Sequence, residues 1–340
     1  MMKKTLITLL QVALGMGLIV FFFMTISHSG KLEDFKATVL LAAENWRLLT
    51  IGTLLFPLCL LSCTLRWLLL LKVQNFNISF SRALVLYFIG HFFSSFMPGA
   101  TSGDLIKAVY VARETPDKKT EVVSTVFIDR IVGLLGLIIL AILMMCIRLD
   151  FFLAHRATRL ALIFNLGLLT ITALGTFIVF GRNLVEKWSF FSRLEKRTRL
   201  GAIITKAYKA FHLCIRNPVV LSKTIALSFL NHVIIVCVIC FIGASIGVHL
   251  GLIDYLTVFP VINAIAGLPI TPGGLGMREG AAIYLLGALN VPAPSALALS
   301  LLVYLITLFW AMVGGIIYMI FVLKTGYDAN KEIKANNLNS

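Results

Sequence analysis

Charged side chains are scarce in this sequence: they make up 13% of its 340 residues, while hydrophobic residues make up 59%. Soluble globular domains carry about 25% charged residues. The shortage therefore excludes an ordinary water-soluble fold. A mean hydropathy of +0.96 indicates that a lipid bilayer is the solvent of this chain.

Acidic residues are the scarcest charges, because 15 Asp and Glu accompany 30 Lys and Arg and leave a formal net charge of +15. In a soluble protein such an excess would point to nucleic acid. Here nine Lys and Arg are concentrated between Arg182 and Arg216. The positive-inside rule explains this bias as a cytoplasmic loop, 181–219, attracted to anionic lipid headgroups. No nucleic-acid partner is expected.

Metal-binding and catalytic patterns are also lacking in the sequence. Most of the six cysteines lie inside apolar runs, and the CxxC pair of Cys237 and Cys240 has no second Cys or His pair at zinc-site spacing. The sequence contains neither a DxD-type acidic pair nor a cluster of His with carboxylates. We therefore expect no metal, no cofactor and no enzymatic activity.

Long apolar runs are what the sequence does contain. Each is near or beyond the roughly 20 residues that cross the hydrocarbon core. The first run follows Lys3 and Lys4 and is longer than the core of a cleaved signal peptide, which favours a retained first span. The six predicted spans are 6–26, 50–71, 122–147, 160–180, 221–247 and 296–323.

Two further apolar segments, 83–97 and 255–270, are short for a span, and each is interrupted by proline and glycine before a second short apolar segment. This pattern predicts two broken helical hairpins, at 83–113 and 255–290. The residues that form the two predicted breaks are Pro98, Gly99 and Gly103 in the first hairpin, and Pro272, Gly273, Gly274 and Gly276 in the second.

The distribution of basic residues orients the hairpins. If 83–97 crossed the membrane, the basic loop would lie outside, so the first hairpin is predicted to enter and leave on the cytoplasmic side. The flanks of the second hairpin, 248–254 and 290–295, contain no Lys or Arg, so this hairpin is predicted to enter from outside. Both chain termini are then cytoplasmic.

These elements together predict an all-α polytopic membrane protein with six full transmembrane helices and two re-entrant hairpins in an inverted-repeat arrangement. Paired interrupted segments in two halves are typical of a transporter's binding site. The transmembrane domain covers 1–324, and 325–340 form a short cytoplasmic tail. Within the basic loop, 200–214 has helical amphipathic spacing, which fits either an interfacial helix or a connector packed under the bundle.

Charges inside apolar segments are candidate site residues, because each costs about 2.5–3.5 kcal/mol at the bilayer centre. Asp104 and Lys107 are spaced i, i+3 and share a helical face, as a local ion pair or as part of a headgroup site. Asp129 and Arg130 point about 100° apart, so each should pair with another element. For Asp129, a salt bridge to Arg66 or Lys107 and direct substrate contact are both open.

Arg66 lies near the end of its span, where snorkelling favours a structural role. Arg278 and Glu279 follow the glycines of the second break. A half-helix that starts there would direct its N–H groups at the break and favour an anion, with Arg278 adding positive charge. Glu279 would balance either Arg278 or a cationic headgroup. The uncharged residues His91, Asn231, His232 and Asn263 are explained by interhelical hydrogen bonds.

Four stretches carry a resemblance to a known family: Arg66-Trp67, the segment from Phe96 to Lys107, Asp129-Arg130 with Gly133, and the segment from Pro272 to Gly280. They resemble the transmembrane region of lysylphosphatidylglycerol synthases, the flippase-like domain of the multiple peptide resistance factor. Ser102 and Lys107 depart from the glycine and arginine common in that family. A soluble aminoacyl-transferase domain is not recognised after Lys324, so synthesis of an aminoacylated lipid is not expected.

The resemblance implies lipid translocation in a bacterial inner membrane, with a phospholipid or a polyprenyl-phosphate-linked lipid as the substrate. Its anionic headgroup would contact Lys107, Arg130 and Arg278. Two alternatives remain from the sequence: a membrane transferase or accessory subunit that acts on lipid-linked sugars, and a scaffold or regulator of a lipid-synthesis enzyme.

Overall fold

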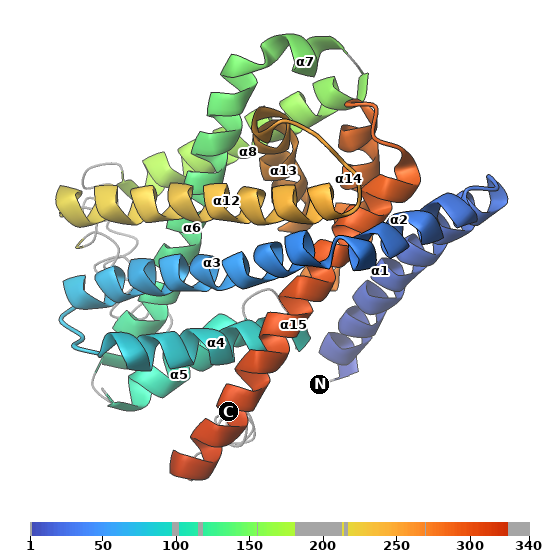
Figure 1. Ribbon diagram of the computed structural model, residues 1–340. Coiled ribbons are helices and arrows are strands. Elements are labelled where there is room, and N and C mark those ends of the chain that lie inside the picture. Colours follow the sequence, from blue (N-terminus) through green and yellow to red (C-terminus); the bar gives the residue numbers. More distant parts are fainter. Residues whose placement is uncertain are drawn as a thin grey trace.

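The computed structural model describes residues 2–96, 102–114, 118–154, 156–180, 213, 217–268 and 270–325, and the regular elements within these ranges are helices (Figure 1). The all-α prediction is confirmed. The helices are α1 (Met2–His28), α2 (Leu32–Glu44), α3 (Trp46–Val73), α4 (Phe80–Phe96), α5 (Ser102–Glu114), α6 (Lys119–Ile147), α7 (Leu149–Ala154), α8 (Arg156–Phe180), α12 (Pro218–Ser245), α13 (Leu252–Ala266), the short 3₁₀ turn η2 (Pro272–Gly274), α14 (Met277–Gly287) and α15 (Ala293–Thr325).

Four helices are long and apolar enough to cross a membrane in the described part of the chain: α3, α6, α12 and α15. They coincide with four of the six predicted spans. The first and fourth predicted spans fall in α1 and α8. In the described part of the chain, the apolar stretches of these helices, Met16–His28 and Thr158–Thr172, are shorter than a span. Four spans are therefore clear, and the count of six is not confirmed.

The segment between the first two predicted spans differs from expectation. No element is predicted there from the sequence, whereas the chain forms α2, which packs against α15 and α12. Asn45 follows α2, and its side-chain amide donates to the carbonyl of Ser245 at 3.2 Å. The helix α2 therefore links α1 to the rest of the protein. The hydropathy of this short, charged segment did not predict these contacts.

Over the first predicted hairpin the structure describes two packed helices, α4 and α5. A Cβ added to Gly103 would lie 1.8 Å from the carbonyl oxygen of Gly90, while Gly90 also faces Lys107, so the helices are antiparallel and in backbone contact. Gly103 thus lies in the first turn of α5, where it permits close packing and is not part of the break. Pro98 and Gly99 lie outside the described residues.

The second break is confirmed between α13 and α14. Pro272 begins η2, and the glycines Gly273, Gly274 and Gly276 have φ angles of 62°, 70° and 80°. These left-handed conformations cost glycine little and other residues more. The returning helix α14 then packs against α13, as α5 does against α4.

The helices pair reciprocally between the two halves of the chain. In Figure 1, α3 runs beside α12, and the two are antiparallel because Gly52 faces Ile242 while Ser62 bonds to Leu227. The hairpin helix α4 packs on α15, and its counterpart α13 packs on α6. Each of these two helices therefore packs on a long helix of the other half of the chain.

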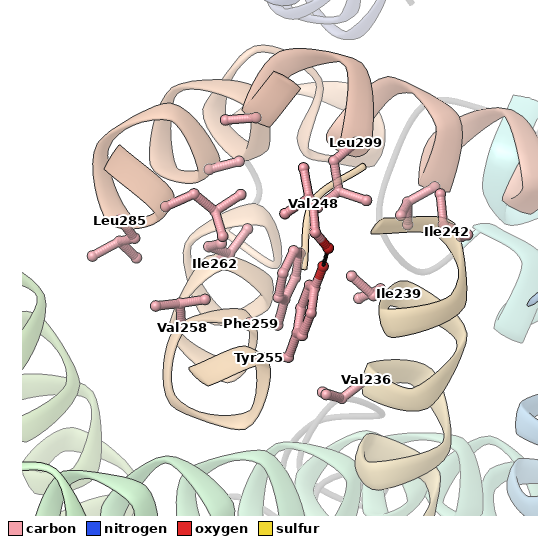
Figure 2. Packing of buried hydrophobic residues seen from close by; sticks show 14 of the residues in the cluster. Val236, Ile239, Ile242, Val248, Tyr255, Val258, Phe259, Ile262, Leu285 and Leu299 are labelled. Atoms are coloured by element: carbon pink, nitrogen blue, oxygen red, sulfur yellow. Dashed lines mark hydrogen bonds between the residues drawn. The ribbon is translucent and has the colours of Figure 1, made fainter. Parts of the chain in front are cut away.

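The core of the second half fixes the position of its hairpin. Figure 2 shows side chains from α12, α13, α14 and α15 converging around Tyr255 and Phe259, whose rings stack at 5.7 Å. The Tyr255 hydroxyl donates to the carbonyl of Val248 at 3.0 Å. A buried aromatic ring with a satisfied hydroxyl anchors α13 to the turn before it.

Three sequence predictions concern segments that fall largely outside the described residues. They are the basic loop 181–219, the amphipathic segment 200–214 and the tail 325–340. These predictions stay as stated from the sequence.

Candidate functional site

An ion pair between α3 and α6 lies at the centre of the first half. The guanidinium Nε of Arg66 is 2.6 Å from Oδ1 of Asp129, and both side chains are buried. A charge-assisted bond of this length is strong, and burial of either group alone would be costly. Of the two roles left open for Asp129, the salt bridge to Arg66 is therefore present, and Arg66 is buried, not snorkelling.

Small groups on α6 and α12 complete the surroundings of Arg66. Its Nη1 donates to the hydroxyl of Ser228 at 3.1 Å, and that hydroxyl donates to the carbonyl of Gly133 at 3.2 Å. The ring nitrogen Nε2 of His232 lies 3.1 Å from the same carbonyl oxygen. A Cβ on Gly133 would be 3.3 Å from the guanidinium, so glycine leaves room for the arginine. The predicted interhelical role of His232 is confirmed.

Next to this pair, Asp104 of α5 bonds to two cations. The ammonium of Lys107 lies 2.6 Å from Oδ1, and Nε of Arg130 donates to Oδ2 at 2.6 Å. Because Arg130 follows Asp129 on α6, the two ion-paired groups adjoin. Both adjacent residues thus pair with other helices, as their divergence on α6 predicts.

The two cations that bond to Asp104 differ in exposure. The Lys107 side chain is 3% exposed, and its ammonium lies 3.8 Å from the ring centre of Tyr87 and 5.0 Å from that of Trp67. These cation–π contacts enclose it. The Arg130 side chain is 38% exposed. Arg130 is therefore the more accessible of the two cations.

We call this set of five residues the first charge cluster: Arg66, Asp104, Lys107, Asp129 and Arg130. It contains three cations and two carboxylates, so its formal charge is positive by one.

The second charge cluster, Arg278 and Glu279, lies on the first turn of α14 against α15. Glu279 is fully buried, and its Oε1 accepts from the Ser300 hydroxyl at 2.9 Å and from Arg278 Nη2 at 3.0 Å. Its Oε2 accepts from the backbone N–H of Gly276 at 2.6 Å, as a capping residue does. Arg278 lies 4.9 Å from the ring centre of Tyr304. This cluster is neutral.

The structure brings the first five predicted residues together and keeps the last two apart from them. In the described part of the chain, Arg278 and Glu279 contact each other and α15, and neither contacts the first charge cluster. Of the two roles left open for Glu279, the ion pair with Arg278 is present. A single headgroup site that includes both clusters is not formed in this conformation.

Four site residues were not identified from the sequence: Tyr87, Ser228, Ser300 and Tyr304. Ser228 and Ser300 are buried hydroxyls that each join a charged pair. They are small polar residues in apolar runs, and such runs contain several others. The sequence carries no signal that distinguishes these two.

An apolar groove of about 490 Å³ lies on the other side of α14, between α8 and the end of α13. Its lining includes Leu160, Phe164, Ile265, Ala281 and Tyr284. A cavity without polar partners does not hold ordered water. The helix α14 therefore has a charged side toward α15 and an apolar side toward α8.

Potential metal ligands do not cluster in the described part of the chain. Among the residues that the structure describes, no three His, Cys, Asp or Glu side chains gather closely enough to hold a metal ion. The chemistry available at the two clusters is electrostatic: guanidinium and ammonium groups beside helix breaks, suited to contact with phosphate.

Comparison with known proteins gives two matches. The family model described as the lysylphosphatidylglycerol synthase TM region matches residues 8–315, which include both charge clusters. The chain is also similar to the UPF0104 membrane protein PH1989 of Pyrococcus horikoshii, with 25% identity over 303 residues that cover 82% of this chain and 89% of that protein.

Proposed function

Because the chain belongs to the family of the lysylphosphatidylglycerol synthase TM region, we propose that it moves a phospholipid or a polyprenyl-phosphate-linked lipid between membrane leaflets. The family match supports a membrane protein with a lipid-related role, and translocation is our specific inference. The membrane is proposed to be the bacterial inner membrane, with both chain termini in the cytoplasm.

The observation that carries the proposal is the binding of one carboxylate, Asp104, by two cations at the start of the helix that follows the first break. Guanidinium and ammonium groups are donors that hold phosphate oxygens, which favours an anionic headgroup beside this group. Arg130 supplies the contact because it is the more exposed of the two cations. A guanidinium can bind phosphate oxygens in a bidentate manner.

The hairpins give the headgroup a polar path. We propose that α4 and α5 enter the membrane from the cytoplasm and that α13 and α14 enter from outside, so that the two breaks meet the bilayer from opposite faces. The reciprocal packing of α4 on α15 and of α13 on α6 supports this arrangement. Acyl chains would stay in lipid while the headgroup passes between the breaks.

A leaflet-resolved assay in proteoliposomes tests the proposal. A fluorescent phosphatidylglycerol is placed in both leaflets, and a membrane-impermeant quencher reports how fast the inner-leaflet probe reaches the outside. Wild-type protein should accelerate this step over protein-free liposomes, and Arg130→Gln should slow it about tenfold, the loss expected for one charge-assisted contact.

The matched control is Arg148→Gln. Arg148 also lies at α6, is 30% exposed and pairs with an aspartate, Asp254, at 2.7 Å, but it is outside the first charge cluster. We expect translocation within about twofold of wild type. Equal rates in Arg130→Gln and wild type would reject the site. Unchanged rates after Arg278→Ala combined with Asp104→Ala would reject both clusters.

The proposal includes no catalytic step. If the purified protein instead formed a product from a labelled sugar or phosphate donor and a lipid acceptor, the transferase alternative would replace it. Co-purification of a stoichiometric lipid-synthesis enzyme, without translocation, would favour the scaffold alternative.

A further inference from the structure

The carboxylate of Glu279 lies where an anionic ligand of the second break would bind. Three kinds of donor converge on it: the backbone N–H of Gly276, the hydroxyl of Ser300 and the guanidinium of Arg278, at 2.6, 2.9 and 3.0 Å. A backbone N–H at a helix start, a hydroxyl and an arginine are the groups that commonly hold a phosphate. Here a side chain of the same helix occupies all three.

We propose that Glu279 is a displaceable internal ligand, which a lipid phosphate replaces at Gly276, Arg278 and Ser300 when the headgroup reaches the second break. This inference rests on the proposed function and specifies how its second site is regulated. In the conformation described, the second break is closed to anions because the cluster is neutral and Glu279 is fully buried.

A polar group beside the break supports a ligand other than Glu279. The hydroxyl of Thr271, the residue before η2, is buried and has no hydrogen-bond partner, and the residue is 6% exposed. A buried hydroxyl without a partner is costly. Because Thr271 directly precedes Pro272, a phosphate or glycerol oxygen that enters the break would give this hydroxyl the partner it lacks.

The first break provides an internal comparison. Asp104 is the third residue of α5, and Glu279 is the third residue of α14, so the two carboxylates hold equivalent places after the two breaks. Asp104 is bonded by two cations, whereas Glu279 is bonded by one cation and a neutral hydroxyl. An anion can therefore join the first cluster with its carboxylate in place, but it must displace the carboxylate of the second.

The test is a titration of the full-length protein in uncharged dodecyl maltoside micelles with dihexanoyl phosphatidylglycerol, followed by calorimetry. Glu279→Gln keeps the shape of the side chain and removes its charge. We expect this variant to bind one more phosphatidylglycerol than wild type, or to bind it about ten- to a hundredfold more tightly at the second break. Arg278→Gln combined with Glu279→Gln should abolish the gain.

The matched control is Asp254→Asn. Asp254 is likewise the third residue of its helix, accepts from the backbone N–H of Gly251 at 3.3 Å and bonds to Arg148, but it is 25% exposed. Neutralisation there should add no binding. An equal gain in Asp254→Asn would mean that any uncapped helix start binds the probe and would overturn the proposal, as would a folded Glu279→Gln variant that binds no better than wild type.

A variant that keeps the charge covers the case in which Glu279→Gln fails to fold. Glu279→Asp is shorter by one methylene and should hold the three donors less well, so we expect a smaller gain in the same direction; no gain overturns the proposal. Failure of the transport proposal can be distinguished from failure of the internal-ligand proposal. If wild type moves no lipid but Glu279→Gln gains a site, the internal-ligand proposal stands and the transport proposal falls.

Discussion

Neutralisation of Asp129 should expose how much of the fold depends on the first charge cluster. In Asp129→Asn, the guanidinium of Arg66 loses its 2.6 Å bond to a carboxylate and keeps two neutral acceptors, the amide oxygen of the asparagine and the hydroxyl of Ser228. Both members of the pair are buried, with side chains 7% and 5% exposed. The change leaves a charge in apolar surroundings with no counterion.

Removal of one partner from a buried ion pair costs about 3–5 kcal/mol. The amide oxygen of asparagine still accepts one hydrogen bond, so we expect the low end, about 3 kcal/mol, or roughly a hundredfold in the unfolding equilibrium. If the uncompensated charge causes this loss, removal of both charges should restore stability. Arg66→Met combined with Asp129→Leu removes both charges and should restore stability to within about 1 kcal/mol of wild type or exceed it.

The assay is unfolding of the purified protein in mixed micelles of dodecyl maltoside with increasing dodecyl sulfate, monitored by tryptophan fluorescence. A loss below about 1 kcal/mol in Asp129→Asn would refute the burial argument. A double variant as unstable as the single one would refute the assignment of the loss to an uncompensated charge. If the double variant is stable, its lipid translocation rate then decides whether the pair is structural or contacts the substrate.

Two further substitutions test the packing around this cluster. Gly103→Ala would put a Cβ 1.8 Å from the carbonyl of Gly90 and should destabilise the protein by at least about 3 kcal/mol in the same unfolding assay, whereas Gly167→Ala on α8, with nothing within 4 Å, should be neutral or slightly stabilising. Trp67→Phe removes the indole donor to Thr125 at 3.2 Å and should cost about 1–3 kcal/mol; no measurable loss would mean that this bond contributes nothing.

Hydropathy predicted the parts of the fold that depend on the solvent. Four spans appear where the apolar runs placed them, because a bilayer fixes both the length and the composition of a crossing helix. The same reasoning missed α2. The charges of Glu33, Asp34 and Lys36 lower the average hydropathy of that segment.

The candidate site was predictable by residue type but not by partner. A charge inside an apolar run is visible in a sequence, so the seven charged candidates could be named from it. Which charges meet depends on how helices cross: Arg66 and Asp129 are separated by 63 positions, and Glu279 and Ser300 by 21. Gly103 shows the same limit, since its role follows from the approach of α4 and not from the flexibility of its own segment.

The equivalent places of Asp104 and Glu279 give the two breaks a common plan with different charge. Both carboxylates hold the returning helix of a hairpin to the span that follows it, α6 through Arg130 and α15 through Ser300. A cation at one position and a hydroxyl at the other make the first break positive and the second neutral. Under the two proposals, a phosphate would bind at the first break without rearrangement and at the second only in exchange for Glu279. The direction in which a lipid is more readily loaded would then follow from the identity of one residue on each span, Arg130 and Ser300.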